Sequence, residues 1–385
     1  MLPKKLQHKL DTRKQENAFR QLGQPNTLTD FASNDYLGFS QSKELFDKTH
    51  AILKNCNKAQ NGATGSRLLS GNHSLFQIVE QQISAFHNSE TALVFNSGYD
   101  ANLGVFSCVP QRHDIVLYDE YCHASIRDGI NMSNAKAFKF KHNDVTAIEQ
   151  LMLRHALPNA ASNQNIYVVT ESVFSMDGDS PDLKTLAQLC KKYKANLIID
   201  EAHAIGVFGD HGCGKVQELN LESAVFARII TFGKALGCHG AALLSHNDLR
   251  DYIINFSRPF IYTTALPPHS LASVKVAYDE LLNQMKQNVS KLRQNITVFC
   301  SEIERLQLQS LFITSDSAIH CCTISGNDKV KTISEALKHK GFDVKAILSP
   351  TVPKGKERLR FCVHSYNSPD DITKVLELLA TFVRV

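Results

Sequence analysis

Short apolar runs alternate with segments long enough for a helix between residues 45 and 245. Parallel strands cannot be joined by a tight hairpin, so each pair needs a crossover of this length, usually a helix. The runs are rich in Val, Ile and Phe, and their spacing is typical of a mainly parallel sheet with helices on both faces. We therefore expect strands in TALVF (91–95), HDIVLYD (113–119), KAFKF (136–140), NIYVVTES (165–172), NLIID (196–200) and ARIITF (227–232).

A second, smaller domain is expected after residue 280. The Pro-Pro step at 267–268 is followed by apolar residues at three- and four-residue spacing, which predicts one long helix over 270–306. Beyond it, AIHCCTIS and ERLRFCVH are strand-like, while TISEALKHKG and DITKVLELLATFV are helical. The expected fold is α/β, with a large domain (46–280), a small α+β C-terminal domain (281–385) and an N-terminal arm (1–45) that packs on the small domain.

Charge and composition narrow the class of protein. The 385 residues are 43% hydrophobic and 21% charged, and the formal charge of +4 is too small to indicate a nucleic-acid binder. The basic N-terminus MLPKKLQHKLDTRKQENAFRQLG has no apolar core, and no later stretch approaches the ~18 apolar residues of a membrane span. Ten cysteines without a C-x-x-C pair indicate neither zinc nor a disulfide framework. We expect a cytoplasmic protein that binds no metal, nucleic acid or membrane.

The run LIIDEAHAIG (197–206) contains DEAH, the acidic box of one class of nucleic-acid-stimulated ATPases. Such an ATPase also needs a phosphate loop, G-x-x-x-x-G-K-[ST], normally upstream of the box. The nearest match, GDHGCGKV (209–216), lies downstream and ends in Val216 where a hydroxyl is required. The ATPase is therefore kept only as an alternative from another class.

The expected strand ends carry a set of polar residues. In open parallel sheets, ligands bind beyond the carboxyl ends of the strands, so these loops would meet at one edge. The turn Asn96-Ser97-Gly98-Tyr99 opens a helix, where backbone N–H groups can hold a phosphate. The other strand-end residues are His123, Ser175, Asp200, His203, Thr231 and Lys234.

Lys234 and Asp200 together point to one cofactor. A lysine beside Gly233, in a loop opposite an aspartate, provides an amine for a Schiff base and a carboxylate that keeps a pyridine nitrogen protonated. Taken alone, each residue has an ordinary structural explanation, such as a surface lysine or a helix cap. Their combination at neighbouring strand ends favours pyridoxal phosphate.

Nine segments carry a resemblance to a known family. The chain resembles the α-oxoamine synthase family of fold-type-I pyridoxal-phosphate enzymes, in order, from about residue 10 to the C-terminus. The resemblance implies a fold-type-I transferase with pyridoxal 5′-phosphate as its cofactor. The segments are SNDYLGFS (33–40), GATGSRLLSGN (62–72), FNSGYDANLG (95–104), DEYCHASIRDG (119–129), ESVFSMDGDSPDL (171–183), DEAHAIGVFG (200–209), TFGKALGCHGAA (231–242), IYTTALPP (261–268) and PTVPKGKERLRF (350–361).

The resemblance also implies roles around the cofactor. Lys234 forms the Schiff base and acts as the general base, Asp200 pairs with the pyridine nitrogen, and His203 faces the ring hydroxyl. His123 stacks on the pyridine ring and reaches the substrate. The remaining cofactor contacts implied are Gly98, Tyr99, Ser175, Thr231 and, from a second subunit, Thr263 or Thr264.

On the substrate side, the resemblance implies that Arg360 binds the amino-acid carboxylate through two hydrogen bonds, with Arg358 as its competitor. Arg20 and Thr351 match positions that contact substrate, although the segment between Arg20 and Phe31 is shorter than in relatives. The wording of GATGSRLLSGN and FSMDGDSPDL is most similar to the biotin-pathway members.

Those members condense L-alanine with a pimeloyl thioester, on coenzyme A or acyl carrier protein, with loss of carbon dioxide. The resemblance also implies a homodimer with the active site at the subunit interface. Glycine C-acetyltransferase, 5-aminolevulinate synthase and serine palmitoyltransferase stay open as alternatives within the family. An inactive binding subunit is disfavoured because Lys234, Asp200, His123 and His203 are all present.

Overall fold

The computed structural model describes residues 2–155, 164–283 and 286–384. The chain divides into two compact units. The larger unit contains residues 35–174 and 180–290, and the smaller unit contains residues 1–34, 175–179 and 291–385. The smaller unit therefore takes in the N-terminal segment and a five-residue excursion at 175–179.

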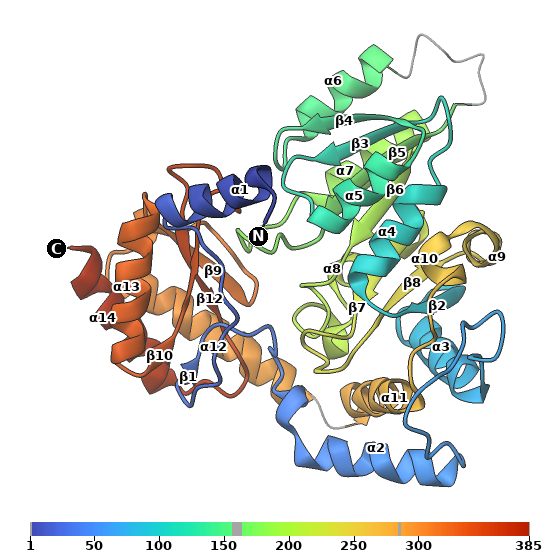
Figure 1. Ribbon diagram of the computed structural model, residues 1–385, viewed down its shortest axis with the longest axis horizontal. Coiled ribbons are helices and arrows are strands. Elements are labelled where there is room, and N and C mark those ends of the chain that lie inside the picture. The colour runs from blue at the N-terminus through green and yellow to red at the C-terminus, as the bar shows by residue number, and fades with distance from the viewer. Residues whose placement is uncertain (1, 156–163, 284–285, 385) are drawn as a thin grey trace. The chain divides into compact units, whose positions relative to one another are not determined.

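The larger unit is built on a seven-stranded sheet, and the six predicted strands all belong to it (Figure 1). Of the six pairs of neighbouring strands, four are parallel, and the two pairs made by the strand Ala241–Ser245 are antiparallel. The sequence analysis did not predict this strand, β8 (Ala241–Ser245), which follows the loop of Lys234 directly, without a helix. In sheet order the strands are β2 (Thr91–Phe95), β8 (Ala241–Ser245), β7 (Ala227–Thr231), β6 (Asn196–Asp200), β5 (Ile166–Glu171), β3 (Ile115–Asp119) and β4 (Lys136–Phe140).

Helices cover both faces of this sheet, as the apolar runs predicted. Alternate strand residues face opposite sides, so Ile198 packs in one core while Leu197 and Ile199 pack in the other. The first core is closed by α4 (Gly98–Cys108), α5 (Ala124–Met132), α9 (Asn247–Phe256) and α10 (Arg258–Ile261). The second is closed by α6 (Val145–His155), α7 (Leu183–Tyr193) and α8 (Lys215–Glu218).

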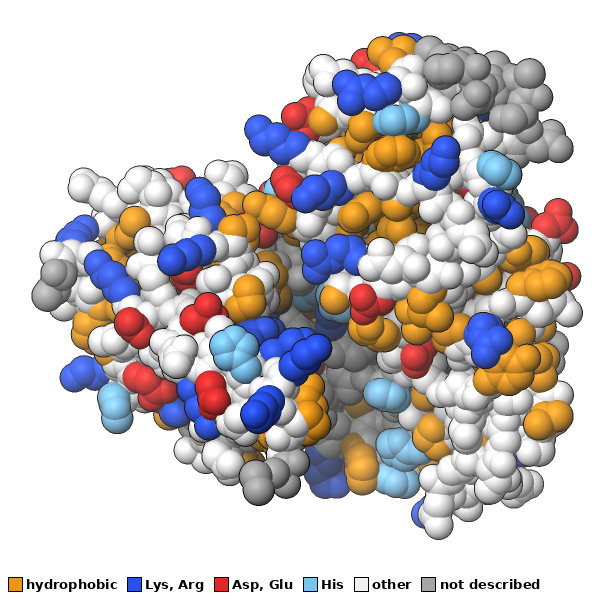
Figure 2. Space-filling model, turned by 45° about the horizontal axis from the view of Figure 1, so that its top comes forward, with side chains coloured by type: hydrophobic (Ala, Val, Ile, Leu, Met, Phe, Trp, Pro, Cys, Tyr) orange, Lys and Arg blue, Asp and Glu red, His pale blue; other side chains and the backbone are white. Residues whose placement is uncertain are grey.

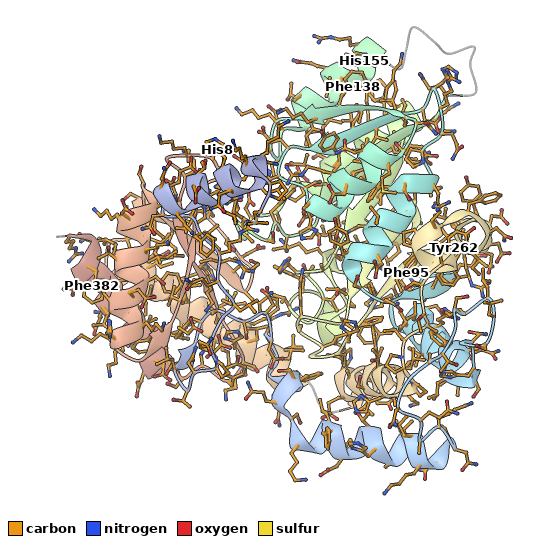
Figure 3. All side chains as sticks on the ribbon, in the orientation of Figure 1. His8, Phe95, Phe138, His155, Tyr262 and Phe382 are labelled. Carbon is orange, nitrogen blue, oxygen red and sulfur yellow. The ribbon has the colours of Figure 1, made fainter. Side chains whose placement is uncertain are left out.

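The exposed edge strand β4 is covered in part by α6. The ring of Phe138 on β4 stacks on the imidazole of His155, the last residue of α6, with the ring centroids 4.0 Å apart (Figure 3). This aromatic contact fixes the end of α6 against the sheet edge.

Among the described residues, three further helices belong to the larger unit. The α3 helix (Ser74–Phe86) packs on β2, and α11 (Pro268–Asn283) contacts both α2 (Lys43–Asn55) and α3. The single helix predicted over 270–306 is found as α11 and α12 (Lys286–Arg305), on either side of residues 284 and 285, which lie outside the described residues. Short 3₁₀ turns occur at η1 (Phe39–Gln41), η3 (Asp210–Gly212) and η4 (Glu222–Ala224).

The smaller unit is α+β. Its three-stranded antiparallel sheet has the order β11 (Lys345–Ile347), β12 (Arg358–Cys362), β9 (Ile319–Thr323). Near the N-terminus, β1 (Thr29–Asp30) pairs in parallel with β10 (Phe342–Asp343), which ties residues 29–30 to this unit. Its helices are α1 (Lys4–Gln15), α13 (Asn327–His339), α14 (Pro369–Val383), the 3₁₀ turn η5 (Gln309–Leu311) and most of α12.

Charged side chains are spread over the surface. On the face drawn in Figure 2, Lys and Arg side chains are scattered, with acidic side chains among them. Among the described residues, no helix is long and apolar enough to cross a membrane.

A buried ion pair fixes the loop that follows β6. Arg228 on β7 donates through Nε (2.9 Å) and Nη2 (2.6 Å) to Oε2 of Glu201, and both side chains are at most 4% exposed. The other oxygen of Glu201 accepts the backbone N–H of Val216 at 3.0 Å. Arg228 also donates to the carbonyl oxygens of His87 and Cys213. The pair therefore holds both ends of the segment between β6 and α8.

We expect Arg228→Met to lower the free energy of unfolding by about 3–5 kcal/mol, because it leaves the charge of Glu201 buried without its partner. Chemical denaturation measures the loss. The double variant Glu201→Gln/Arg228→Met should recover part of it, since no charge is then stranded. Lys192→Met breaks the exposed pair with Glu149 and serves as the control. An Arg228→Met loss no larger than that of the control would contradict the assignment.

Candidate active site

The phosphate-type turn after β2 is formed as the sequence predicted. Ser97 caps α4, its Oγ accepting the backbone N–H of Asp100 at 3.0 Å. Gly98 is the first residue of the helix, and a Cβ added there would lie 3.6 Å from Oγ1 of Thr231. The turn thus combines helix N–H groups with a hydroxyl from the end of β7. Such a combination is suited to a phosphate.

Thr263 and Thr264 lie beside the same turn in their own chain. The side-chain amide of Asn96 donates to Oγ1 of Thr263 at 3.0 Å and to the carbonyl oxygen of Thr264 at 2.7 Å. Thr264 is exposed and Thr263 is half-buried. The segment after α10 is therefore held against the β2–α4 connection.

Asp200 ends β6 and is only 6% exposed. One carboxylate oxygen accepts Nδ2–H of Asn102 at 2.7 Å, and the other accepts the backbone N–H of Ala202 at 2.9 Å. Both oxygens of this carboxyl group are thus held by N–H donors. Asn102, on α4, was not predicted to belong to the site. Its side chain is buried, and its only signal in the sequence is its place in FNSGYDANLG, one of the segments that carried the family resemblance.

His203 lies three residues beyond Asp200 and is 4% exposed. Its Nδ1 shares a 2.7 Å hydrogen bond with the hydroxyl of Tyr36, which is fully buried. This bond fixes the orientation of the imidazole. Tyr36 was also missed by the residue analysis, although it lies in SNDYLGFS, one of the segments that carried the family resemblance.

His123 precedes α5 and accepts, at Nδ1, the backbone N–H of Ser125. The same nitrogen lies 2.7 Å from the Ser125 hydroxyl. Although the residue is exposed as a whole, desolvation of its imidazole lowers the pKa of His123; Asp200 opposes this shift, and Lys234 adds to it. The ring is therefore neutral at pH 7, the form suited to stacking on a flat cationic ring.

Tyr99 lies edge-on to His123, with the ring centroids 6.5 Å apart and the planes at 82°. Its hydroxyl donates to Asp128 on α5. Together these contacts join the first turn of α4 to the N-terminal half of α5.

Lys234 lies half-buried in the loop between β7 and β8. Backbone hydrogen bonds close this loop: Gly237 N–H donates to the Lys234 carbonyl, and Cys238 N–H donates to the Phe232 carbonyl, both at 2.8 Å. The positive charge of Lys234 lowers the pKa of His123 and opposes the rise in the pKa of Glu171. Lys234, His123 and Asp200 therefore form one electrostatic cluster.

The remaining predicted residues belong to the smaller unit. Arg360 on β12 is 6% exposed and donates to the carbonyl oxygen of Ser175 (2.7 Å) and to Oδ1 of Asn34 (3.0 Å). Arg20 and Thr351 are both exposed and are brought together, with Nη2 of Arg20 donating to Oγ1 of Thr351 at 3.2 Å. Within this unit, the structure thus forms two pairs, Arg360 with Ser175 and Arg20 with Thr351.

The residues of the larger unit fit pyridoxal phosphate. The helix turn at Gly98 with Thr231 matches the phosphate, and the buried, doubly hydrogen-bonded carboxyl group of Asp200 matches a pyridine nitrogen. Lys234 supplies the amine within the same electrostatic cluster. A buried carboxylate that accepts two N–H bonds and lies near a lysine is difficult to explain as a structural feature alone.

We expect borohydride reduction of the protein with bound pyridoxal phosphate to fix the cofactor on the peptide that contains Lys234, because hydride reduces a Schiff base to a stable amine. Lys234→Ala should carry no fixed cofactor after the same treatment. Peptide mass spectrometry measures the adduct. Lys215→Met, which removes a buried lysine hydrogen-bonded to Ser180, is the matched control and should keep the adduct. An adduct on another lysine of Lys234→Ala would refute the assignment.

Comparison with known proteins identifies the family. The model of the family described as aminotransferase class I and II matches residues 26–379. An 8-amino-7-oxononanoate synthase from Emericella nidulans is 38% identical over 372 residues, covering 94% of this chain and 90% of that protein.

Two solved structures extend the comparison. The 8-amino-7-oxononanoate synthase of Francisella tularensis is 28% identical, with a TM-score of 0.78 over 94% of this chain and 99% of its own. A serine palmitoyltransferase from S. paucimobilis, with a bound adduct of pyridoxal phosphate and myriocin, is 25% identical, with a TM-score of 0.87 over 99% and 97%. The chain therefore belongs to the class I and II aminotransferase family and, within it, to the α-oxoamine synthases, which are fold-type-I enzymes that use pyridoxal 5′-phosphate.

Proposed function

We propose that this enzyme condenses L-alanine with a pimeloyl thioester and releases carbon dioxide and the thiol, forming 8-amino-7-oxononanoate for biotin synthesis. The observation that carries the proposal is the 38% identity with an 8-amino-7-oxononanoate synthase over 94% of the chain. Serine palmitoyltransferase has the higher TM-score, but that score measures the backbone, which the family shares. Substrate choice depends on side chains, for which sequence identity is the better guide.

The larger unit supplies the cofactor contacts. Gly98 and Thr231 hold the phosphate, His123 stacks on the ring, and Asp200 keeps the pyridine nitrogen protonated. His203, oriented by Tyr36, binds the ring hydroxyl. When bound, the cofactor supplies a conjugated cationic ring that accepts electrons from bonds at the amino-acid Cα.

Lys234 serves as both cofactor anchor and base. Once the amine of alanine has taken the place of Nζ on the cofactor, the free Nζ would take the proton from Cα of alanine. Proton removal needs the neutral amine, and backbone hydrogen bonds hold the loop that carries Lys234 at the strand end. The neutral imidazole of His123 holds the reacting plane and donates a hydrogen bond to the substrate carboxylate or to the new ketone oxygen.

We propose Arg360, rather than Arg358, as the clamp for the alanine carboxylate. Arg358 is bound to Asp177 in a buried ion pair and also donates to the carbonyl oxygen of Met176. Its charge is thereby compensated within the protein. Arg360 donates to the carbonyl oxygen of Ser175 and to Oδ1 of Asn34, and these two bonds orient its guanidinium group. Arg20 and Thr351, which already bond to each other, act as the further substrate contact.

We also propose a homodimer in which Thr263 or Thr264 reaches the phosphate bound by the partner. The support is an exposed apolar surface around them. Tyr262 is 74% exposed and Leu69 is 84% exposed. Their loops are joined by a 3.0 Å hydrogen bond from Ala265 N–H to the Gly65 carbonyl. Large exposed apolar residues in neighbouring loops are typical of a protein interface.

The cytoplasmic location stays a prediction from sequence.

The substrate assignment is tested by a matrix of alanine, glycine and serine against pimeloyl-, acetyl- and palmitoyl-coenzyme A, with pimeloyl-acyl carrier protein as a second donor. Thiol release gives the rate, and mass spectrometry identifies the product. We expect the pair of alanine and pimeloyl thioester to give the highest kcat/KM. Faster turnover of serine with palmitoyl-coenzyme A, or of glycine with an acetyl donor, would replace the proposed function.

For Arg360→Ala we expect the KM for alanine to rise about 10- to 100-fold, with the cofactor still bound, because one charged hydrogen-bond partner of the carboxylate is lost. Steady-state kinetics at saturating thioester measure it. Arg358→Ala is the control: it removes the buried ion pair with Asp177 and lowers stability, but the folded fraction should keep its KM. If only Arg358→Ala raises the KM, the clamp is Arg358.

A further inference from the structure

Glu171 has no role in the scheme above, although it lies beside its central residue. It is the last residue of β5 and is 3% exposed. In the parallel pairing of β5 with β6, Glu171 is in register with Asp200. Register partners on adjacent strands point to the same side of a sheet. Two buried carboxyl groups are therefore neighbours at the carboxyl end of the sheet.

Two such groups cannot both be ionised without a large electrostatic cost, so the hydrogen bonds decide which one keeps its proton. Asp200 accepts N–H bonds from Asn102 and from Ala202, one on each oxygen. Within the described part of the chain, the carboxyl group of Glu171 accepts one such bond, from the backbone N–H of His123 at 2.6 Å. The charge is better stabilised on Asp200. Consistent with this, burial and the charge of Asp200 raise the pKa of Glu171 to about 8.

The bond to His123 gives Glu171 a second effect. Oε1 of Glu171 accepts the N–H of the residue that caps α5, so the carboxyl group ties the start of that helix to the end of β5. The Ser125 contact then fixes the imidazole ring relative to this backbone. Glu171 thus contacts one residue proposed to bind the cofactor and is the strand neighbour of another.

We propose that Glu171 is a positioning residue that stays protonated at neutral pH. The negative charge then remains on Asp200, and the carbonyl oxygen of the Glu171 carboxyl group holds the backbone N–H of His123. The inference rests on the proposed function only in that Asp200 and His123 serve the cofactor. It does not depend on which amino acid or thioester is used.

Other charged groups also face this site. Lys234, in the loop after β7, attracts negative charge and opposes protonation of Glu171. Asp119, at the end of β3, acts in the same direction as Asp200 but is held by His142 and by the backbone N–H groups of Tyr121 and Asn143.

The Cys122 thiol completes this set. Burial, with the charge of Asp119, raises the pKa of this thiol well above its usual range, so it stays neutral.

The proposal fixes the sign of a pH effect on stability. An unfolded glutamate loses its proton near its ordinary value of 4.5, whereas folded Glu171 keeps it up to about 8. Between these values the folded protein binds the extra proton, so this group makes the protein less stable as pH rises. Glu171→Gln lacks that proton. Its stability relative to the wild type should therefore increase from about pH 5 to about pH 8.

The test compares Glu171→Gln, a neutral isostere, with Glu171→Ala, which removes the acceptor for His123. Infrared spectra of the cofactor-loaded protein, recorded at pH 7 without substrate, should show a protonated carboxyl band that Glu171→Gln lacks. Glu149→Gln is the control, because hydrogen bonds from Lys192 and Tyr193 lower the pKa of Glu149 and keep it ionised. That variant should leave the band unchanged.

In the kinetics we expect Glu171→Gln to keep kcat within about threefold and to lose an ionisation near pH 8 from the pH profile, while Glu171→Ala loses about tenfold or more. A wild type without the protonated band, or a Glu171→Gln variant as impaired as Glu171→Ala, would overturn the proposal. The infrared and stability readouts use no thioester, so they stand even if the pimeloyl assignment fails.

Discussion

The buried ion pair between Glu201 and Arg228 holds the functional edge of the sheet in place. It joins β6 to β7 and, through the backbone of Val216, fixes the far end of the loop that carries Asp200 and His203. Asp200 and Glu201 are consecutive, yet one carboxylate belongs to the site and the other to the scaffold. The scaffold charge is compensated within the protein, which holds the loop beside Asp200 in one conformation.

Around Asp200, the site consists of interacting charges rather than separate side chains. Asn102 and Ala202 donate hydrogen bonds to the carboxyl group of Asp200. Lys234 carries the opposite charge, and both Asp200 and Lys234 influence the pKa of His123, which is neutral. Glu171 adds a carboxyl group to this cluster without, on our proposal, adding a second negative charge. A change at Asp200 or Lys234 should therefore alter the protonation of His123 and Glu171.

Much of the fold could be predicted because its signals are local. The six runs of Val, Ile and Phe became strands, and the residues that follow them met at one edge, since parallel strands bring their carboxyl ends together. The strand β8 was missed because it follows a tight loop instead of a helix, so the alternation that indicated the others was absent.

The sequence by itself determined the strand-end chemistry: a lysine, an aspartate, two histidines and a glycine turn, each after an apolar run, together with the order of segments that indicates the family. Only the tertiary structure decided which residues support them. Asn102 meets Asp200 across 98 positions, Tyr36 meets His203 across 167, and Glu171 meets His123 across 48. A pattern along the chain carries no information about such pairs, because they form only when the sheet brings distant segments to one edge.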